Sequence, residues 1–339
     1  AGGSSGGSGA AVSANFCTVG IGQEGLASIR RPSIWNGIAG MRPTAGLVSR
    51  GGVYAGWPSI NGSLGPMART VTDLARLLDC MVGYDPEDPI TSRGVGHVPD
   101  SYAEMLDGAS LKGARIGVLR EPIGYFSDPN SDDFNKVTEV FDRAVADLKS
   151  EGAEIVDPVV IPDLLYLLTK RASNVEDEEQ SFANYVAGSA NAPFASRTEA
   201  MSSPLFAEVL QGARRRWESE RPPEAHYEYL KAREILMTRL LGVMADHKLD
   251  AIVHKAVEHQ PTLIRDGVNP PFVDQKGAPS INTFLVYVPS VVVPAGFTRD
   301  DLPAGITFLG RPYDDSNMIC LAHAYEQATQ HRRQPENTP

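Results

Sequence analysis

The stretch from residue 115 to residue 160 decides the fold class. It reads RIGVL at Arg115–Leu119, DDFNKVTEVFDRAVADLKS at Asp132–Ser150 and AEIVDPVV at Ala153–Val160. The outer two segments are short apolar runs bounded by glycine or proline, which is typical of buried strands. The middle segment repeats apolar residues at helical spacing and ends just before Gly152. A strand, a helix and a second strand in this order predict an α/β sheet with crossover helices.

The same alternation extends in both directions from this stretch. Towards the C-terminus the sequence predicts a helix over 224–247, strands over 250–253, 290–293 and 305–309, and a closing helix over 316–330. Towards the N-terminus, a helix is predicted to begin at Thr70, with Asp73 completing a capping box. Glycine, proline and asparagine crowd residues 33–66, so we expect a long ordered loop there with little regular structure.

Composition narrows the class of protein. The 339 residues are 42% hydrophobic and 22% charged, as in a globular protein. A net charge of −11 argues against nucleic acid or an anionic membrane as the main partner. Three cysteines (Cys17, Cys80 and Cys320), which we expect in the core, fit a reducing compartment. With no apolar run near the ~20 residues of a membrane span and no signal peptide, we expect a cytoplasmic enzyme.

The chain opens with AGGSSGGSG at residues 1–9. Taken in isolation, this composition is typical of a flexible linker. A phosphate-binding loop fits poorly, because no lysine follows the last glycine. A linker predicts nothing about later residues, whereas a catalytic loop requires partner groups downstream, so the remainder of the chain decides between the two.

The chain resembles the amidase signature family of serine amidohydrolases. Residues 2–8 resemble its glycine–serine core, and Ser28 follows Ser4 by 24 positions, the family's separation between its first motif serine and its nucleophile. The similar segments are SIRRP at 28–32, NGIAGMRPT at 36–44, GPMARTV at 65–71, PSVVVPAG at 289–296, LPAGITFLGR at 302–311 and AYEQAT at 324–329. The similarity covers nearly the whole chain.

This resemblance implies a fold. We expect a single domain over residues 1–339, with a mixed β-sheet core covered by helices on both faces, forming two thirds or more of the family fold. Residues 160–285, where the similarity is weakest, are expected to be mostly helical and to form the substrate pocket. The N-terminal part of the family fold is expected to be missing from this chain.

The resemblance also implies a catalytic apparatus. A serine hydroxyl is a weak nucleophile that needs a base, and the seven histidines show no convincing His–Asp arrangement in the sequence. The family instead uses a Ser–Ser–Lys triad in which the first serine follows a cis peptide bond. Carried over, Ser28 is the nucleophile, Ser4 relays its proton and later protonates the leaving amine, and Ser5 supports them by hydrogen bonding.

By the same resemblance, backbone N–H groups of the loop before the helix form an oxyanion hole: Gly25, Leu26, Ala27 and Ser28. This chain has QEGLAS where the family usually has T-D-x-G-G-S. Because Leu26 and Ala27 do not freely adopt a positive φ, either the loop keeps φ negative or Gly25 takes the unusual angle.

Two charged residues flank this loop. Glu24 is expected to replace the family's Asp as a hydrogen-bond acceptor. Arg30 is expected to anchor the loop by binding backbone carbonyls or a carboxylate, as a guanidinium fork does well. Further along, His254 and His259 with Glu258 fit no usual zinc spacing, so we expect no metal site. The resemblance allows one of the two histidines to contact the substrate.

The implied activity is hydrolysis of the C–N bond of a small linear amide through an acyl-enzyme on Ser28, with no metal or organic cofactor. No lysine of the chain matches the family's catalytic lysine, which leaves three explanations open: a truncated chain, a separate fragment or chain that supplies the lysine, or an inactive remnant. Two alternative functions also stay open, the catalytic subunit of a glutamine-dependent amidotransferase and a non-catalytic protein. A homodimer is expected only by analogy.

Overall fold

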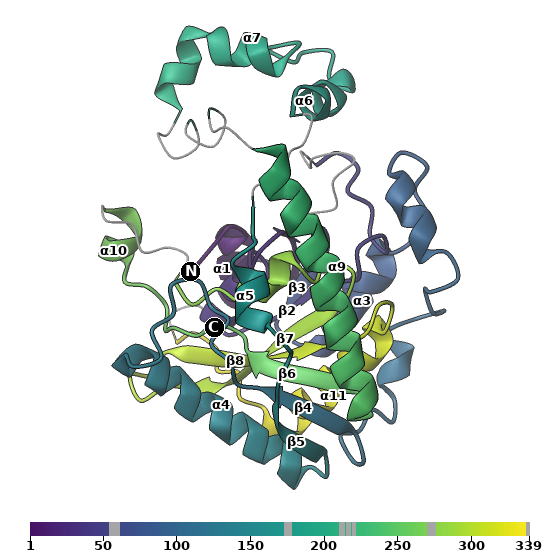
Figure 1. The fold of residues 1–339 in the computed structure, drawn as a ribbon, viewed down its shortest axis with the longest axis vertical. Coiled ribbons are helices and arrows are strands. Elements are labelled where there is room, and N and C mark those ends of the chain that lie inside the picture. Colours follow the sequence, from purple (N-terminus) through teal and green to yellow (C-terminus); the bar gives the residue numbers. More distant parts are fainter. Residues whose placement is uncertain are drawn as a thin grey trace.

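A mixed eight-stranded sheet lies at the centre of the computed structural model, which describes residues 1–53, 62–172, 178–209, 222–269 and 276–336 with Arg214 and Glu218 (Figure 1). The strands are β1 (Val19–Glu24), β2 (Ala39–Arg42), β3 (Ser63–Ala68), β4 (Arg115–Leu119), β5 (Glu154–Val159), β6 (Ala251–Lys255), β7 (Ser290–Phe297) and β8 (Pro303–Leu309). Their order is β1-β3-β2-β7-β8-β6-β4-β5. Strand β4 is parallel to β5 and β6, and the other neighbours are antiparallel.

Helices cover both faces of this sheet (Figure 1). The α-helices are α1 (Gly6–Ser13), α2 (Arg30–Trp35), α3 (Val71–Met81), α4 (Asp132–Ser150), α5 (Leu164–Leu168), α6 (Glu178–Ala187), α7 (Arg197–Ser202), α9 (Pro223–Asp246), α10 (Ile264–Val268) and α11 (Asp315–Thr329). Short 3₁₀ helices span Pro89–Gly94, Glu104–Leu106, Pro204–Glu208 and Ser280–Thr283. Helices α3, α4 and α11 pack on one face, and α1, α2, α5 and α9 pack on the other. Helices α6 and α7 lie together, apart from the sheet.

Strand β6 shows why each face is apolar. Its five residues are all buried, and successive side chains point to opposite faces. Val253 packs with the core formed by α3, α4 and α11, whereas Ile252 packs with the core formed by α5 and α9. His254 lies on the same face as Ile252, and its side chain is buried.

The α/β class, the mixed sheet and the two helical layers are therefore confirmed. Helix α3 begins as predicted, since the Oγ1 of Thr70 accepts a hydrogen bond from the Asp73 N–H at 3.1 Å. Strand β4 and helix α4 have the predicted bounds. The remaining predicted strands and helices are present, with ends displaced by a few residues.

The predicted loop over residues 33–66 is wrong at its two ends and holds over residues 43–53, while residues 54–61 lie outside the described part of the chain. This stretch contains the end of α2, all of β2 and the start of β3, and β2 pairs with both β3 and β7 inside the sheet. Two of its glycines, Gly40 and Gly65, are required by close packing. A Cβ on Gly40 would overlap Ser33, and a Cβ on Gly65 would overlap the carbonyl of Met41.

Of the two interpretations of the glycine–serine tract, the linker is excluded, because Gly6–Ser13 forms α1 and packs against β1 and β3. One further expectation is corrected. Cys17 and Cys80 are exposed, so neither is a core residue, whereas Cys320 is half-buried and packs against the core beneath α3, α4 and α11. Cys17 follows the end of α1, and Cys80 lies on the outer side of α3 near its last turn. Among the described helices, none is both long and apolar enough to cross a membrane.

Candidate functional site

The two serine loops lie side by side on the α1–α2 face of the sheet. Ser4 and Ser5 precede α1, Ser28 precedes α2, and the Ser5 N–H donates to the carbonyl of Ser28 at 3.0 Å. Ser4 is exposed and Ser28 is half-buried. The peptide bond between Gly3 and Ser4 is cis. Within the described part of the chain, neither the Ser4 nor the Ser28 hydroxyl makes a hydrogen bond.

Residues 25–28 form a row of unused amide groups. None of the N–H groups of Gly25, Leu26, Ala27 and Ser28 donates a hydrogen bond within the described part of the chain. No residue in this row has a positive φ, so the first of the two expected loop conformations is the one found, and Gly25 takes no unusual angle. N–H donors without partners in a partly exposed loop are available to a developing negative charge.

The carboxylate of Glu24 binds the two residues that follow this row, Ile29 and Arg30. Its Oε2 accepts hydrogen bonds from the N–H groups of Ile29 and Arg30, both at 2.9 Å. Its Oε1 accepts from Nε of Arg30 at 2.6 Å, so a carboxylate is the anchor that Arg30 uses. Burial alone raises the pKa of the Glu24 carboxyl, but the charges of Arg30 and Arg42 outweigh it and hold that pKa below its usual range. Glu24 is therefore a buried, charged acceptor.

Arg42 is a residue of this cluster that sequence reasoning missed. It lies in β2, buried, with Nη1 4.0 Å from Oε1 of Glu24, and its guanidinium donates to the carbonyls of Asn282 and Leu285. Burial, followed by the positive charge of Arg30, lowers its pKa to about 9. In the sequence, the signal for a buried charge here is an arginine within AGMR at residues 39–42, a segment otherwise made of small and apolar residues.

Ser5 joins the tract to the sheet. Its Oγ accepts a hydrogen bond from the Gln23 N–H at 3.1 Å, and Oγ of Ser8 donates to the carbonyl of Ile21 at 3.1 Å. The Gln23 N–H and the Ile21 carbonyl both belong to β1. Gly22, between them, allows the close contact, because a Cβ there would lie 2.9 Å from Oγ of Ser5. The serine tract is thus held along the edge strand.

The structure contains a His–Asp pair that was not expected. Nδ1 of His259 lies 2.6 Å from Oδ2 of Asp133, and the imidazole is buried. Asp133 is 126 residues away at the start of α4, so no local motif reveals the pair. The carbonyl of His259 accepts a hydrogen bond from Nε1 of Trp35, at 3.3 Å. Among the described residues, no group of three His, Cys, Asp or Glu side chains is placed to hold a metal.

His254 and Lys255 are buried next to one another but face opposite ways. Nδ1 of His254 lies 2.7 Å from the Lys255 carbonyl, so Nδ1 carries the proton, and burial lowers the His254 pKa to about 4. Nζ of Lys255 donates to Thr138 at 2.7 Å and lies 3.5 Å from the Phe134 ring centre. Burial lowers the Lys255 pKa to about 8. This lysine faces α4, on the opposite side of the sheet from Ser4.

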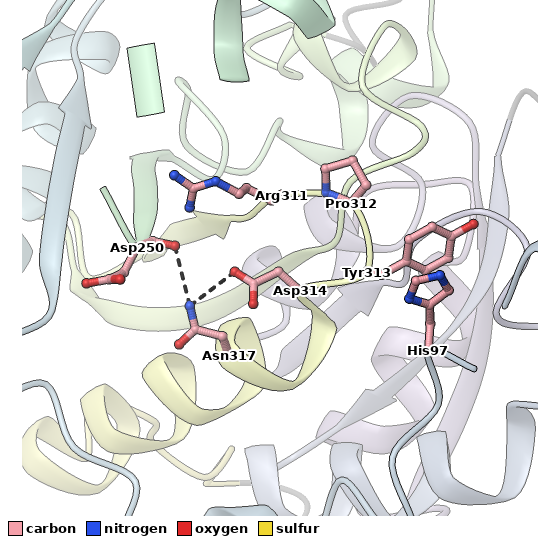
Figure 2. A pocket seen from close by; sticks show the side chains of 7 residues that line it. All are labelled: His97, Asp250, Arg311, Pro312, Tyr313, Asp314 and Asn317. Atoms are coloured by element: carbon pink, nitrogen blue, oxygen red, sulfur yellow. Dashed lines mark hydrogen bonds between the residues drawn. The ribbon is translucent and has the colours of Figure 1, made fainter. Parts of the chain in front are cut away.

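A separate cavity of about 420 Å³ opens where β6 begins and α11 starts (Figure 2). It is lined by His97, Asp250, Arg311, Pro312, Tyr313, Asp314 and Asn317. The His97 and Tyr313 rings stack at 3.9 Å, while Asp314 and Asn317 meet on the other side. The cavity shares no residue with the serine loops.

Comparison with known proteins shows a consistent likeness. A family model described as Amidase matches residues 1–319. A glutamyl-tRNA(Gln) amidotransferase subunit of Microcystis aeruginosa is 32% identical, over 99% of this chain and 69% of its own length. The peptide amidase of Stenotrophomonas maltophilia is 30% identical with a TM-score of 0.73, over 98% of this chain and 67% of the other. A protein named PAM12A superposes with a TM-score of 0.80 at 29% identity, over 98% of this chain and 67% of the other.

Proposed function

The chain belongs to the amidase family, and from this premise we propose that it cleaves the C–N bond of a small linear amide through an acyl-enzyme on Ser28. The observation that carries the proposal is the row of N–H groups at residues 25–28, which have no partner among the described residues and include the N–H of the half-buried Ser28. A nucleophile beside preorganised donors is what acyl transfer requires.

The proposed reaction starts when Oγ of Ser28 attacks the amide carbonyl carbon and loses its proton to Ser4. The carbonyl oxygen becomes an oxyanion, and the N–H groups of residues 25–28 bind it; each such donor typically lowers the barrier by ~3–4 kcal/mol. The C–N bond then breaks, and Ser4 gives a proton to the leaving amine. Water then attacks the carbonyl carbon of the resulting ester and passes a proton to Ser4. The bond to Oγ of Ser28 breaks, Ser4 returns a proton to that oxygen, and the acid leaves.

Glu24, Arg30 and Ser5 support this reaction without touching the substrate. The two hydrogen bonds from Ile29 and Arg30 to Glu24 fix the residues that follow Ser28. The ion pair with Arg30 keeps that carboxylate charged. Ser5 joins the loop of Ser4 to that of Ser28 through its backbone N–H. The donors therefore need little reorganisation when charge develops.

The base that accepts the Ser4 proton is proposed to be a lysine from a segment or subunit outside the 339 residues. Lys255 is the described lysine with burial and a lowered pKa, and it lies on the wrong face of the sheet. We propose that residues 1–339 act as one domain, that residues 160–285 shape the substrate pocket, and that the enzyme works in the reducing cytoplasm, where its three cysteines stay free.

A fluorophosphonate probe tests the proposal on the whole protein, purified with any segments and subunits that accompany it. We expect labelling at Ser28, seen by peptide mass spectrometry, and none in Ser28→Ala. The Ser202→Ala variant is a matched control, because Ser202 is an unrelated serine on α7. Labelling at another serine, or unchanged labelling of Ser28→Ala, overturns the assignment.

A second candidate function is favoured by the relative from Microcystis aeruginosa, which is part of an amidotransferase by name. In that case the amide would be glutamine, and the released ammonia would pass to an acceptor on a partner subunit. Stoichiometric partners during purification, together with glutamine hydrolysis that needs Ser28, would favour this role. Hydrolysis of peptide or aryl amides by the protein without partners would favour the simple amidase.

A further inference from the structure

Arg31 holds the loop that carries Ser4. Its Nη2 and Nε donate to the carbonyl of Gly3 at 2.7 and 3.2 Å, and the side chain is buried. This carbonyl belongs to the peptide group that precedes Ser4. A forked pair of hydrogen bonds to one carbonyl fixes the plane of that peptide group, and with it the direction in which Ser4 leaves the backbone.

Trp35 holds Arg31 in turn. The guanidinium carbon of Arg31 lies 5.5 Å from the centre of the Trp35 ring, which is within the range of a cation–π contact. The same indole fills the space beside Gly2, because a Cβ there would lie 2.8 Å from Cε3 of Trp35. Gly2 also has φ of +69°, which few other residues adopt. One side chain therefore packs against both the arginine and the start of the loop.

The His–Asp pair completes the chain of contacts. Nε1 of Trp35 donates to the His259 carbonyl at 3.3 Å, and His259 is held by Asp133 at 2.6 Å. Asp133 stands in the first turn of α4, a helix of 19 residues. The position of Gly3 is thus linked, contact by contact, to a long helix that packs on the other face of the sheet.

We propose that Arg31 is a positioning residue for Ser4, held in place by Trp35 and through it by the Asp133–His259 pair. The inference rests on the proposed function, in which Ser4 relays the proton of Ser28. Loss of the guanidinium lets the peptide group before Ser4 turn and moves the Ser4 hydroxyl away from its proton-relay position. A misplacement of about 1 Å at a reacting group costs roughly a hundredfold in rate.

The test measures the rate of Ser28 labelling by a fluorophosphonate in the whole protein, separated into its maximal rate and its half-saturating concentration. Arg31→Ala is expected to lower the maximal rate roughly ten- to hundredfold. The half-saturating concentration is expected to stay within about threefold, since the misplaced group touches no probe atom. Free guanidinium ion, added below denaturing concentrations, is expected to restore part of the rate.

Arg69→Ala is the matched control. Arg69 also donates to backbone carbonyls of the N-terminal segment, those of Val12 and Cys17 at 3.0 and 2.7 Å, but not to the loop of Ser4. The Arg69→Ala variant is expected to be less stable than the wild type and to be labelled at Ser28 at the same rate. If Arg31→Ala does not fold, Arg31→Lys takes its place, because it keeps a cation but loses the two-pronged hydrogen bond to the Gly3 carbonyl, and it is expected to lower the maximal rate in the same way.

The outcomes separate this inference from the proposed function. Unchanged labelling in Arg31→Ala, or a loss seen only in the half-saturating concentration, overturns the positioning role and leaves Ser28 as nucleophile. A loss of maximal rate that guanidinium does not restore, and that Arg69→Ala reproduces, also overturns it. Full labelling of Ser28→Ala contradicts the proposed function instead.

Discussion

The carboxylate of Glu24 lies 2.6 Å from Nε of Arg30, and both side chains are almost completely buried. This pair joins the last residue of β1 to the first residue of α2, so it closes the loop that contains Ser28. Ions are costly to bury, and this arrangement is stable because the carboxylate also accepts two backbone N–H groups. The loop that we propose as an oxyanion hole therefore depends on one buried charge.

Glu24→Gln is expected to destabilise the protein strongly. The amide leaves the Arg30 charge buried without a counter-charge, which costs about 3–5 kcal/mol in comparable buried pairs. Chemical denaturation measures the free energy of unfolding. Glu154→Gln is the control, because its ion pair with Arg115 is half-exposed and such pairs contribute about 0–1 kcal/mol. Equal losses in the two variants would contradict the role given to burial.

Ser4→Ala is expected to slow the reaction while leaving the fold intact. Ser4 is exposed, and its hydroxyl makes no hydrogen bond to the described residues, so little stability is at risk. Loss of a proton-transfer group lowers rates by roughly 10²–10⁴-fold. The maximal rate of amide hydrolysis, or of Ser28 labelling, measures the effect. Ser8→Ala removes a hydroxyl from the same tract and is expected to keep most of the rate, because among the described residues that hydroxyl binds the Ile21 carbonyl and no other group.

Some of this structure was accessible from the sequence, for physical reasons. Helix α4 and strand β4 were predicted with their observed bounds, because their apolar periodicity is local and strong. Strand β2 was missed, since its four residues show no period and owe their conformation to pairing with β3 and β7. Strand β3 was also missed, because its glycine and proline are typical of a loop, whereas its extended conformation depends on pairing with β1 and β2.

The candidate site likewise contains residues that the sequence identified and contacts that it could not show. The resemblance identified Ser4 and Ser28, and the structure brings their loops together through Ser5; their catalytic roles stay predictions. No local pattern could show that Asp133 contacts His259, or that Arg31 binds the carbonyl of Gly3, because these contacts join residues 126 and 28 positions apart. Such contacts depend on how the sheet brings distant segments together.

Asp315 is expected to make the protein less stable as the pH rises through 6. Its carboxyl is buried and receives hydrogen bonds from the N–H and Oγ1 of Thr44, and burial raises its pKa from 3.8 to about 6. Between pH 3.8 and pH 6 the folded protein binds more protons at Asp315 than the unfolded chain does. The contribution of Asp315 to the free energy of unfolding, up to about 3 kcal/mol, is therefore fully present below pH 3.8 and is lost as the pH rises through 6. Unfolding of wild type and Asp315→Asn at pH 4 and pH 7 measures this contribution.

The asparagine keeps an acceptor for the Thr44 N–H and does not ionise, so its free energy of unfolding should vary less with pH. Asp88→Asn is the contrasting variant. Burial alone raises the pKa of Asp88, but the hydrogen bonds and charge of Arg50 outweigh it and lower that pKa. Its effect on the pH dependence should therefore have the opposite sign. The same sign in both variants would contradict the opposite pKa directions of Asp315 and Asp88.

His254 is expected to weaken the fold in acid. Burial lowers its pKa from 6.5 to about 4, so between these values the unfolded chain takes up a proton that the folded protein does not. Stability then falls as the pH decreases from 6.5 towards 4, by up to about 3 kcal/mol. His254→Asn keeps a donor for the Lys255 carbonyl and does not titrate, so it should lose this acid sensitivity even if it is less stable at pH 7. Unfolding of both proteins at pH 4.5 and pH 7 decides the point, and an equal loss of stability in acid for the two proteins would contradict the role given to His254.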